Sequence, residues 1–245
     1  MSEMILEVHG LRKKYGSYEA VKGIDFHINK GEVFALIGPN GAGKTTSLRM
    51  ISTLLSITDG EVMLNGIDVK KQSDEVRKYI TYLPDEAGAY KNMKGIDYLK
   101  FMAQLCTDTS DKAKSAVELA VEISGLRDRI NEKISAYSRG MTRKLLLARA
   151  VMTKPVLAIL DEPTSGLDII NGLDIRNLIK RLAEEENMSF LISGHNMLEI
   201  EYISNRVAII DKGIIHATGS PAGLKQEFGS DNLEEVFVKA VKGHE

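Results

Sequence analysis

The sequence predicts an α/β fold with a mainly parallel sheet, an N-terminal antiparallel β subdomain and an inserted α-helical subdomain. Three observations lead to this prediction. Short apolar runs bounded by turn residues fill the first third of the chain, and the stretch from about Gly95 to Ala150 has helical periodicity without a strand candidate. Strands alternate with helices after that stretch, as is typical of a parallel sheet covered on both faces.

The apolar runs of the first third are bounded by turn residues. The tripeptide Asn29–Gly31 predicts a hairpin turn between the second and third runs, and Pro84 ends the last one. The strands expected here are Ile5–Val8, Ile24–Ile28, Val33–Ile37, Glu61–Leu64 and Ile80–Leu83.

A glycine-rich loop follows one of these strands. Gly38–Thr46 reads GPNGAGKTT and matches the pattern G-x-x-x-x-G-K-[ST]. The strand Val33–Ile37 precedes it, and the helical pattern Ser47–Ile51 follows it. Strand, loop and helix in this order are the context that makes the pattern a phosphate-binding loop. The sequence therefore predicts a P-loop NTPase (RecA-like) core that binds a nucleoside triphosphate.

The residue types within this loop suit a phosphate chain. We expect Gly38, Gly41 and Gly43 to let the backbone wrap around an anion and turn its N–H groups inward. The N-terminus of the following helix adds partial positive charge, and Lys44 adds a full one. Thr45 offers a hydroxyl to the Mg²⁺ that accompanies the nucleotide.

Helical periodicity predicts the remaining elements. Ser110 and Asp111 are expected to cap a helix that ends at Gly125, and another helix is expected over Asn232–Val241. Strands between helices are expected at Val156–Leu160, Phe190–Ser193 and Val207–Ile210.

We interpret residues 1–245 as a single domain with three parts. Residues 1–88 and 151–219 form the nucleotide-binding core with its β subdomain, residues 89–150 form the helical subdomain, and residues 220–245 form a C-terminal helical extension. This extension either packs on the core or pairs with a second copy.

Composition and charge are those of an ordinary globular protein, with 43% hydrophobic and 27% charged residues. The net charge of −2 gives no indication of nucleic-acid binding. No signal peptide is visible, and no apolar run approaches the roughly 20 residues that cross a bilayer. We therefore expect a soluble, cytoplasmic protein. The single cysteine, Cys106, excludes an internal disulfide, and its apolar helical surroundings favour core packing.

Two acids follow the apolar run Leu157–Leu160. The carboxyl ends of parallel strands share one edge of the sheet, so Asp161 and Glu162 are expected near the phosphate loop. Asp161 suits the Mg²⁺ shell, and Glu162 is then free to polarise a water aimed at the γ-phosphate. A helix-capping pair is the alternative.

The chain resembles the ATP-binding cassette of ABC transporters from about Leu6 to Gly219. Five motifs of that family occur in the family's order, which makes the resemblance specific. They are GPNGAGKTT at Gly38–Thr46, YLPD at Tyr82–Asp85, YSRGM at Tyr137–Met141, LAILDEPTSGLD at Leu157–Asp168 and SGHN at Ser193–Asn196.

The resemblance implies a set of ATP contacts within one copy. Tyr15 stacks on adenine, with Tyr18 as the lower-ranked alternative. Glu162 is the catalytic base, Lys44 serves the phosphates, and His195 reaches the γ-phosphate as the family's switch histidine. The cofactor-binding loop comprises Gly38, Pro39, Asn40, Gly41, Ala42, Gly43, Lys44, Thr45 and Thr46.

The resemblance also implies contacts between two copies. Ser138 and Gly140 of one copy meet the ATP held by the other, and Asp168 ends a loop that contacts the opposite subunit. Arg139 stands where most of the family has glycine, which we expect to be tolerated only if its backbone needs no positive φ. Together with Arg143 and Lys144 it is expected to raise the positive potential offered to a phosphate.

A second departure concerns the metal. Asp85 stands where the family usually has glutamine, and it joins Thr45 and Asp161 as a hard oxygen ligand for Mg²⁺. A solvated loop acid is the alternative. The YSxGM form of the third motif, at Tyr137–Met141, is similar to that of an exporter branch whose permeases are usually separate polypeptides.

The resemblance implies an ATP-hydrolysing, Mg²⁺-dependent subunit that dimerises through ATP and powers a separate integral-membrane permease, with export as the expected direction. The permease is expected to dock near Glu86–Ile96, which places this subunit on the cytoplasmic face of the membrane. The alternative is an ABC-type ATPase with a non-transport or regulatory role. The transported substance is not encoded in this chain.

Overall fold

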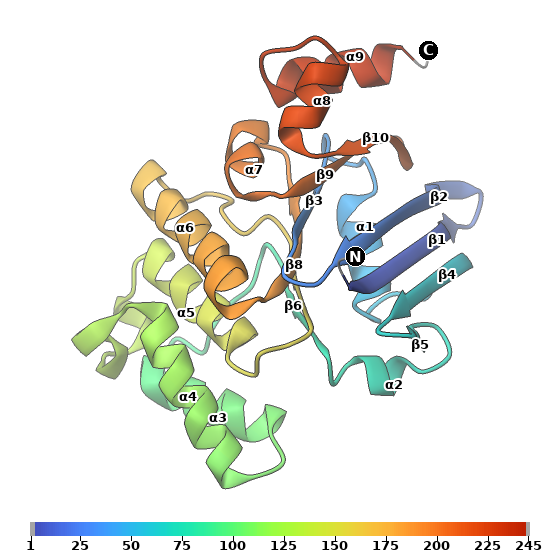
Figure 1. Ribbon diagram of the computed structural model, residues 1–245. Coiled ribbons are helices and arrows are strands. Elements are labelled where there is room, and N and C mark those ends of the chain that lie inside the picture. Colours follow the sequence, from blue (N-terminus) through green and yellow to red (C-terminus); the bar gives the residue numbers. More distant parts are fainter. Residues whose placement is uncertain (1–2, 244–245) are drawn as a thin grey trace.

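The computed structural model describes residues 3–243, which form two sheets and a set of covering helices (Figure 1). The smaller sheet is antiparallel and has the strand order β2-β1-β4-β5. Its strands are β1 (Met4–Tyr15), β2 (Tyr18–Asn29), β4 (Asp59–Leu64) and β5 (Ile67–Asp68).

The larger sheet has the strand order β10-β9-β3-β8-β7-β6. All of its neighbouring strands run parallel except the edge pair β9 and β10. Its strands are β3 (Val33–Ile37), β6 (Ile80–Leu83), β7 (Leu157–Leu160), β8 (Ser189–Gly194), β9 (Arg206–Asp211) and β10 (Ile214–Gly219).

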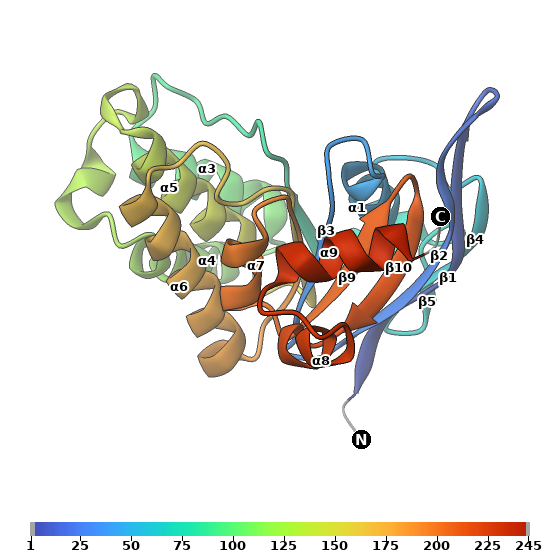
Figure 2. The same cartoon turned by 90° about the horizontal axis from the view of Figure 1, so that it is seen from above.

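Helices cover the larger sheet, and α3, α4 and α5 gather on the side away from the smaller sheet (Figures 1 and 2). The helices are α1 (Lys44–Ile51), α2 (Ser73–Val76), α3 (Gly95–Cys106), α4 (Ser110–Ser124), α5 (Arg139–Val151), α6 (Ile169–Glu186), α7 (Met197–Ile203), α8 (Pro221–Glu227) and α9 (Leu233–Lys242). Two short 3₁₀ turns, Arg127–Asn131 and Ile134–Ala136, join α4 to α5. Within residues 3–243, no helix combines the length and apolar character needed to span a bilayer.

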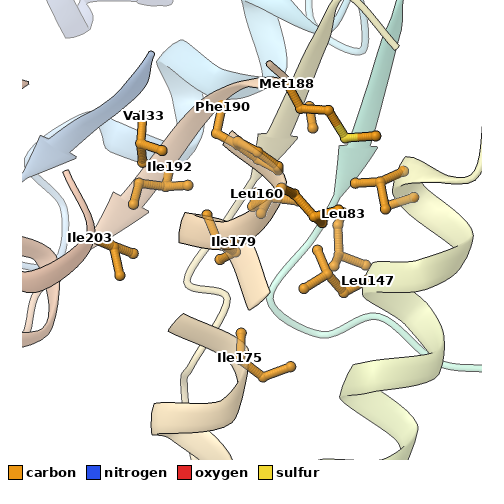
Figure 3. Close-up of a cluster of buried hydrophobic side chains, with 14 of the residues drawn as sticks. Val33, Leu83, Leu147, Leu160, Ile175, Ile179, Met188, Phe190, Ile192 and Ile203 are labelled. Atoms are coloured by element: carbon orange, nitrogen blue, oxygen red, sulfur yellow. The ribbon is translucent and has the colours of Figure 1, made fainter. Parts of the chain in front are cut away.

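Both faces of the central strands β3, β7 and β8 are buried. Alternate residues of each strand point to opposite sides and so enter two different apolar clusters. On β3, Val33 and Ile37 belong to the apolar cluster under α5, α6 and α7, and Phe34 belongs to the cluster shared with α1 and the smaller sheet. Figure 3 shows the first cluster, in which Leu147 and Ile179 extend from α5 and α6 toward the sheet. This packing holds the carboxyl ends of the central strands in fixed positions.

The predicted fold class is confirmed: a mainly parallel core carries an N-terminal antiparallel sheet and a group of helices. The helix predicted from Ser110 ends at Gly125 in a left-handed conformation, although Thr109 rather than Ser110 caps its start. At the C-terminal end, α9 packs against α7, α8 and the strands β9 and β10, burying Leu233 and Val236.

Two expectations about this part of the chain were wrong. Asn29–Gly31 forms a turn, but the strands on either side of it, β2 and β3, belong to different sheets and do not pair. Turn residues indicate where a strand ends and do not specify its partner. Cys106 is exposed at the end of α3 rather than packed in the core.

Candidate functional site

The phosphate loop joins β3 to α1, and its glycines act in different ways. Gly43 caps α1 with φ +106°, and a Cβ there would lie 2.8 Å from the carbonyl oxygen of Ala20. Gly38 has no such φ, and a Cβ there would lie 2.0 Å from the carbonyl oxygen of Ile210. Gly38 is therefore required for close packing on β9 and not for a left-handed backbone.

Lys44 is the first residue of α1, and only 6% of its surface is exposed. Its Nζ donates to the carbonyl oxygens of Gly38 at 2.7 Å and Pro39 at 3.1 Å. The same atom lies 3.7 Å from Glu162 Oε1. Burial lowers the pKa of Lys44, while the carboxylates of Glu162 and Asp161 oppose that shift. The ammonium thus lies at the centre of the loop, facing both acids.

Asp161 follows β7 and is buried among hydroxyl groups. Its Oδ1 accepts hydrogen bonds from Thr45 Oγ1 at 3.1 Å and Ser193 Oγ at 2.5 Å. Its Oδ2 accepts one from the Tyr82 hydroxyl at 3.1 Å. Burial raises the pKa of Tyr82 to about 12, which keeps its hydroxyl protonated as a donor. A carboxylate beside a threonine hydroxyl is a hard oxygen donor set that fits Mg²⁺.

Glu162 extends from a strained position. Its φ is +48°, which is uncommon for a residue with a side chain. Its N–H donates to Ser193 Oγ at 3.0 Å, and its Oε2 lies 2.8 Å from Nδ1 of the exposed His195. The hydroxyl of Ser193 therefore supports both acids, through the Asp161 carboxylate and the Glu162 backbone.

A cavity of about 350 Å³ brings most of the predicted site together. Tyr15 and Tyr18 both line it and are 49% and 62% exposed. The ammonium of Lys13 lies 5.2 Å from the centre of the Tyr15 ring, which supports that ring from one side. The predicted residues lining the cavity are Tyr15, Asn40, Gly41, Ala42, Gly43, Lys44, Thr45, Thr46, Asp85, Asp161 and Glu162.

Three predicted residues form a separate group that does not line this cavity. Ser138 caps α5, and its Oγ accepts a hydrogen bond from the N–H of Met141 at 3.2 Å. Asp168 caps α6 through the N–H of Asn171 at 3.0 Å, and that hydrogen bond lowers the Asp168 pKa. A Cβ at Gly140 would lie 2.3 Å from the Asn171 side chain, so the starts of the two helices touch.

The basic residues of α5 are placed differently from the prediction. Arg139 begins the helix without a positive φ, as expected. Arg143, however, is buried and donates only to backbone carbonyls, and Lys144 lies 2.6 Å from the Asp174 carboxylate. Both side chains are therefore engaged within their own chain, and their contribution to the potential at a phosphate stays a prediction.

Tyr82 and Ser193 lie inside the YLPD and SGHN motifs, but neither motif predicts a role for these hydroxyls. Their hydroxyls meet Asp161 across 79 and 32 positions of the chain. The available signal was their place beside the carboxyl ends of β6 and β8, the strands that flank β7.

The strand–loop–helix phosphate site, with two acids at the end of a neighbouring parallel strand, defines a nucleotide-binding protein of the P-loop class. Residues 21–165 match the model of the family described as ABC transporter. The chain therefore belongs to the ABC transporter family, as an ATP-binding, ATP-hydrolysing subunit.

Curated relatives cover nearly the whole chain. It is 34% identical over 237 residues to the linearmycin resistance ATP-binding protein LnrL of Bacillus subtilis (strain 168), covering 97% of this chain and 76% of that protein. It is 36% identical over 211 residues to the bacitracin transport ATP-binding protein BcrA of Enterococcus faecalis, covering 86% of this chain and 68% of that protein.

Solved structures share the fold. An ATP-binding subunit of an ABC transporter superimposes with a TM-score of 0.84 at 24% identity, covering 97% of this chain and 99% of that one. A dimeric ATP-binding cassette in a post-hydrolysis state, bound to ADP and Pi, gives a TM-score of 0.77 at 22% identity. That match covers 88% of this chain and 98% of the other.

Proposed function

We propose that two copies of this chain hold ATP and Mg²⁺ between them and hydrolyse the ATP to drive a separate membrane permease that exports its substrate. The observation that carries this proposal is the division of the site. Lys44, Asp161 and Glu162 gather around one cavity, whereas Ser138 and Asp168 form a second group that does not line it. A second copy facing the first would bring the two groups together around one nucleotide.

Within one copy, some cavity residues would bind the adenine of ATP and others its phosphates. The Tyr15 ring is exposed at the cavity wall and supported by Lys13, so it is available to stack on adenine. The phosphates would lie against the N-terminus of α1, where backbone N–H groups, the helix dipole and Lys44 favour negative charge.

Mg²⁺ would be held by Thr45, Asp161 and Asp85, together with phosphate oxygens and water, as proteins usually hold this ion. When bound, it neutralises charge on the β- and γ-phosphates. The roles of the protein residues follow from their contacts. Ser193 and Tyr82 fix the orientation of the Asp161 carboxylate, and the Thr45 hydroxyl already points at it.

Glu162 is proposed as the general base. Water attacks the γ-phosphorus, the bond to the bridging oxygen of ADP breaks, and Glu162 accepts the proton of the water. His195, 2.8 Å from the carboxylate, orients it and reaches the γ-phosphate. The φ of +48° at Glu162 is a strained backbone conformation. Ser193 Oγ stabilises this conformation by accepting a hydrogen bond from the Glu162 N–H.

The comparisons favour transport and dimerisation. Relatives named for linearmycin resistance and bacitracin transport are ATP-binding proteins of the same family, and one similar structure is a dimer with ADP and Pi. We propose that the permease docks near Glu86–Ile96 and holds this subunit at the cytoplasmic face of the membrane. The permease, and not this chain, would determine which substance is exported.

The test is phosphate release by the purified chain, alone and reconstituted with the membrane subunit with which it co-purifies. Lys44→Ala is the control, because it removes the only ammonium that faces both acids in the described cavity. We expect Mg²⁺-dependent release that the permease modulates and Lys44→Ala abolishes. Absence of turnover in both preparations would instead favour a regulatory, non-catalytic role.

A further inference from the structure

Arg143 of α5 connects two loops of the candidate site. Its guanidinium donates to the carbonyl oxygens of three consecutive residues after β7, Asp161–Pro163, at 2.7 to 3.2 Å. It also donates to the two carbonyl oxygens of Pro84–Asp85 after β6, at 3.2 and 3.1 Å. One side chain thus holds the backbone that carries both acids and the backbone that carries Asp85.

The match between donors and acceptors is complete. Arginine has five N–H donors in a rigid planar fork, and five carbonyl oxygens receive them. Only 7% of the Arg143 surface is exposed. Burial lowers its pKa and the Asp85 carboxylate opposes this shift, yet a guanidinium remains charged at neutral pH. Lysine, with three donors and no fork, cannot make the same contacts.

Arg143 lies on the same helix, α5, as Ser138, the residue expected to contact the partner's ATP. Ser138 caps the same helix, five residues earlier, which is roughly 7.5 Å along the axis at 1.5 Å per residue. A displacement of the helix start by a bound nucleotide therefore moves the guanidinium with it. Glu162, with its positive φ, relies on surrounding contacts to hold its geometry.

We infer that Arg143 is a positioning residue that makes the hydrolytic site of its own chain depend on whether its own Ser138 has engaged the nucleotide of the partner copy. This inference rests on the proposed function. It means that each copy's Glu162 and Asp85 loops are adjusted when that copy caps the other copy's ATP.

The first experiment replaces Arg143 by lysine. Because the lesion shifts the Glu162 backbone, we expect hydrolysis to fall on the order of 10- to 100-fold while ATP affinity changes little. Lys144→Gln is the matched control, since it removes a cation from the next position of the same helix together with its Asp174 partner contact. An Arg143→Lys rate equal to that of the control would overturn the inference.

A mixed dimer of two differently tagged copies confines hydrolysis to one site. Glu162→Gln on the second copy stops hydrolysis at that copy's own site, so turnover reports only the site of the first copy. Ser138 of the first copy caps the ATP of the stopped site and not that of the working site. Ser138→Ala is therefore placed on the first copy, with and without Arg143→Lys on the same copy.

We expect Ser138→Ala on the first copy to slow hydrolysis at that copy's own site, and to add no further loss once Arg143→Lys is present on the same copy. An unchanged rate with Ser138→Ala, or an equal further loss on top of Arg143→Lys, would contradict the inference. An unmodified mixed dimer that fails to hydrolyse ATP would refute the proposed function itself, which keeps the two failures distinct.

A measurement without any change at Arg143 guards against misfolding of the variant. In Glu162→Gln protein, the Nε–H resonance of Arg143 should shift when Mg²⁺-ATP forms the dimer. The added change Ser138→Ala should reduce that shift. An unshifted resonance in an ATP-bound dimer would overturn the inference.

Discussion

Nδ1 of His195 lies 2.8 Å from Oε2 of Glu162, and this contact joins the loops that follow β8 and β7. The two residues are 33 positions apart in the chain and meet because their strands are parallel neighbours. The carboxyl ends of parallel strands share one edge of the sheet, where ligands bind in open α/β folds. Glu162, the proposed base, and His195, proposed to orient it, are therefore positioned by sheet order.

Ser193 supports both acids, so Ser193→Ala should affect stability and rate together. The change leaves the Glu162 N–H without its acceptor and Asp161 without one donor. We expect a loss of about 1–3 kcal/mol in the free energy of unfolding, measured by urea titration, and slower hydrolysis. Ser204→Ala, which removes a hydroxyl bonded to Ile200 away from the site, is the control. Equal stability losses and unchanged hydrolysis would argue against a supporting role for Ser193.

Tyr15→Ala should weaken ATP binding through lost stacking. Stacking of a base on an aromatic ring contributes about 1–3 kcal/mol, so affinity should fall roughly 5- to 150-fold. Binding of inorganic tripolyphosphate, which has no base, should be unchanged. Calorimetry on Tyr15→Ala and Tyr18→Ala distinguishes the two tyrosines of the cavity wall. A larger loss in Tyr18→Ala would transfer the stacking role to that residue.

Asp85→Asn should raise the Mg²⁺ concentration needed for half-maximal hydrolysis several-fold. The change removes a carboxylate from the cavity that holds Thr45 and Asp161. Binding of ATP in the presence of a chelator should tighten, because a negative charge facing the phosphates is gone. Asp74→Asn on the exposed α2 is the control. An unchanged Mg²⁺ requirement would identify Asp85 as a solvated loop acid.

Tyr82→Phe should make the free energy of unfolding depend less steeply on pH in the alkaline range. The folded state raises the Tyr82 pKa from 10.0 to about 12, so it holds the phenolic proton more tightly than the unfolded chain does. The stabilisation linked to this proton is complete below pH 10 and is lost as pH rises toward 12. Denaturant titrations across that range should show a steeper loss for the unchanged chain. Identical slopes would show that burial of Tyr82 does not control this proton.

Local sequence patterns predicted the parts of the site whose residues are close together in the sequence. The phosphate loop needs only its own glycines, Lys44 and the flanking strand and helix. Asp161 and Glu162 were predicted near that loop because strand ends meet at one sheet edge. The edge strand β10 was missed, because it is only partly buried and its alternation is weak.

Long-range contacts explain what the sequence could not show. Arg143 was expected to add to the positive potential offered to a phosphate, but its five acceptors lie 18 to 59 positions away and occupy its whole guanidinium. The hairpin expected at Asn29–Gly31 failed for the same reason, since pairing with β1 is decided by packing across the sheet. Periodicity shows which residues are apolar, whereas the partner of a polar side chain depends on the finished fold.

The most direct test of the account uses Glu162→Gln. Loss of the base should slow hydrolysis by roughly 10²-fold or more while ATP binding persists. The molar mass of this variant should then be measured by size-exclusion chromatography with light scattering, with and without Mg²⁺-ATP. The account predicts a monomer without nucleotide and a stable dimer with it, since ATP joins the Lys44 group of one copy to the Ser138 group of the other. A variant that binds ATP at saturation and stays monomeric would contradict it.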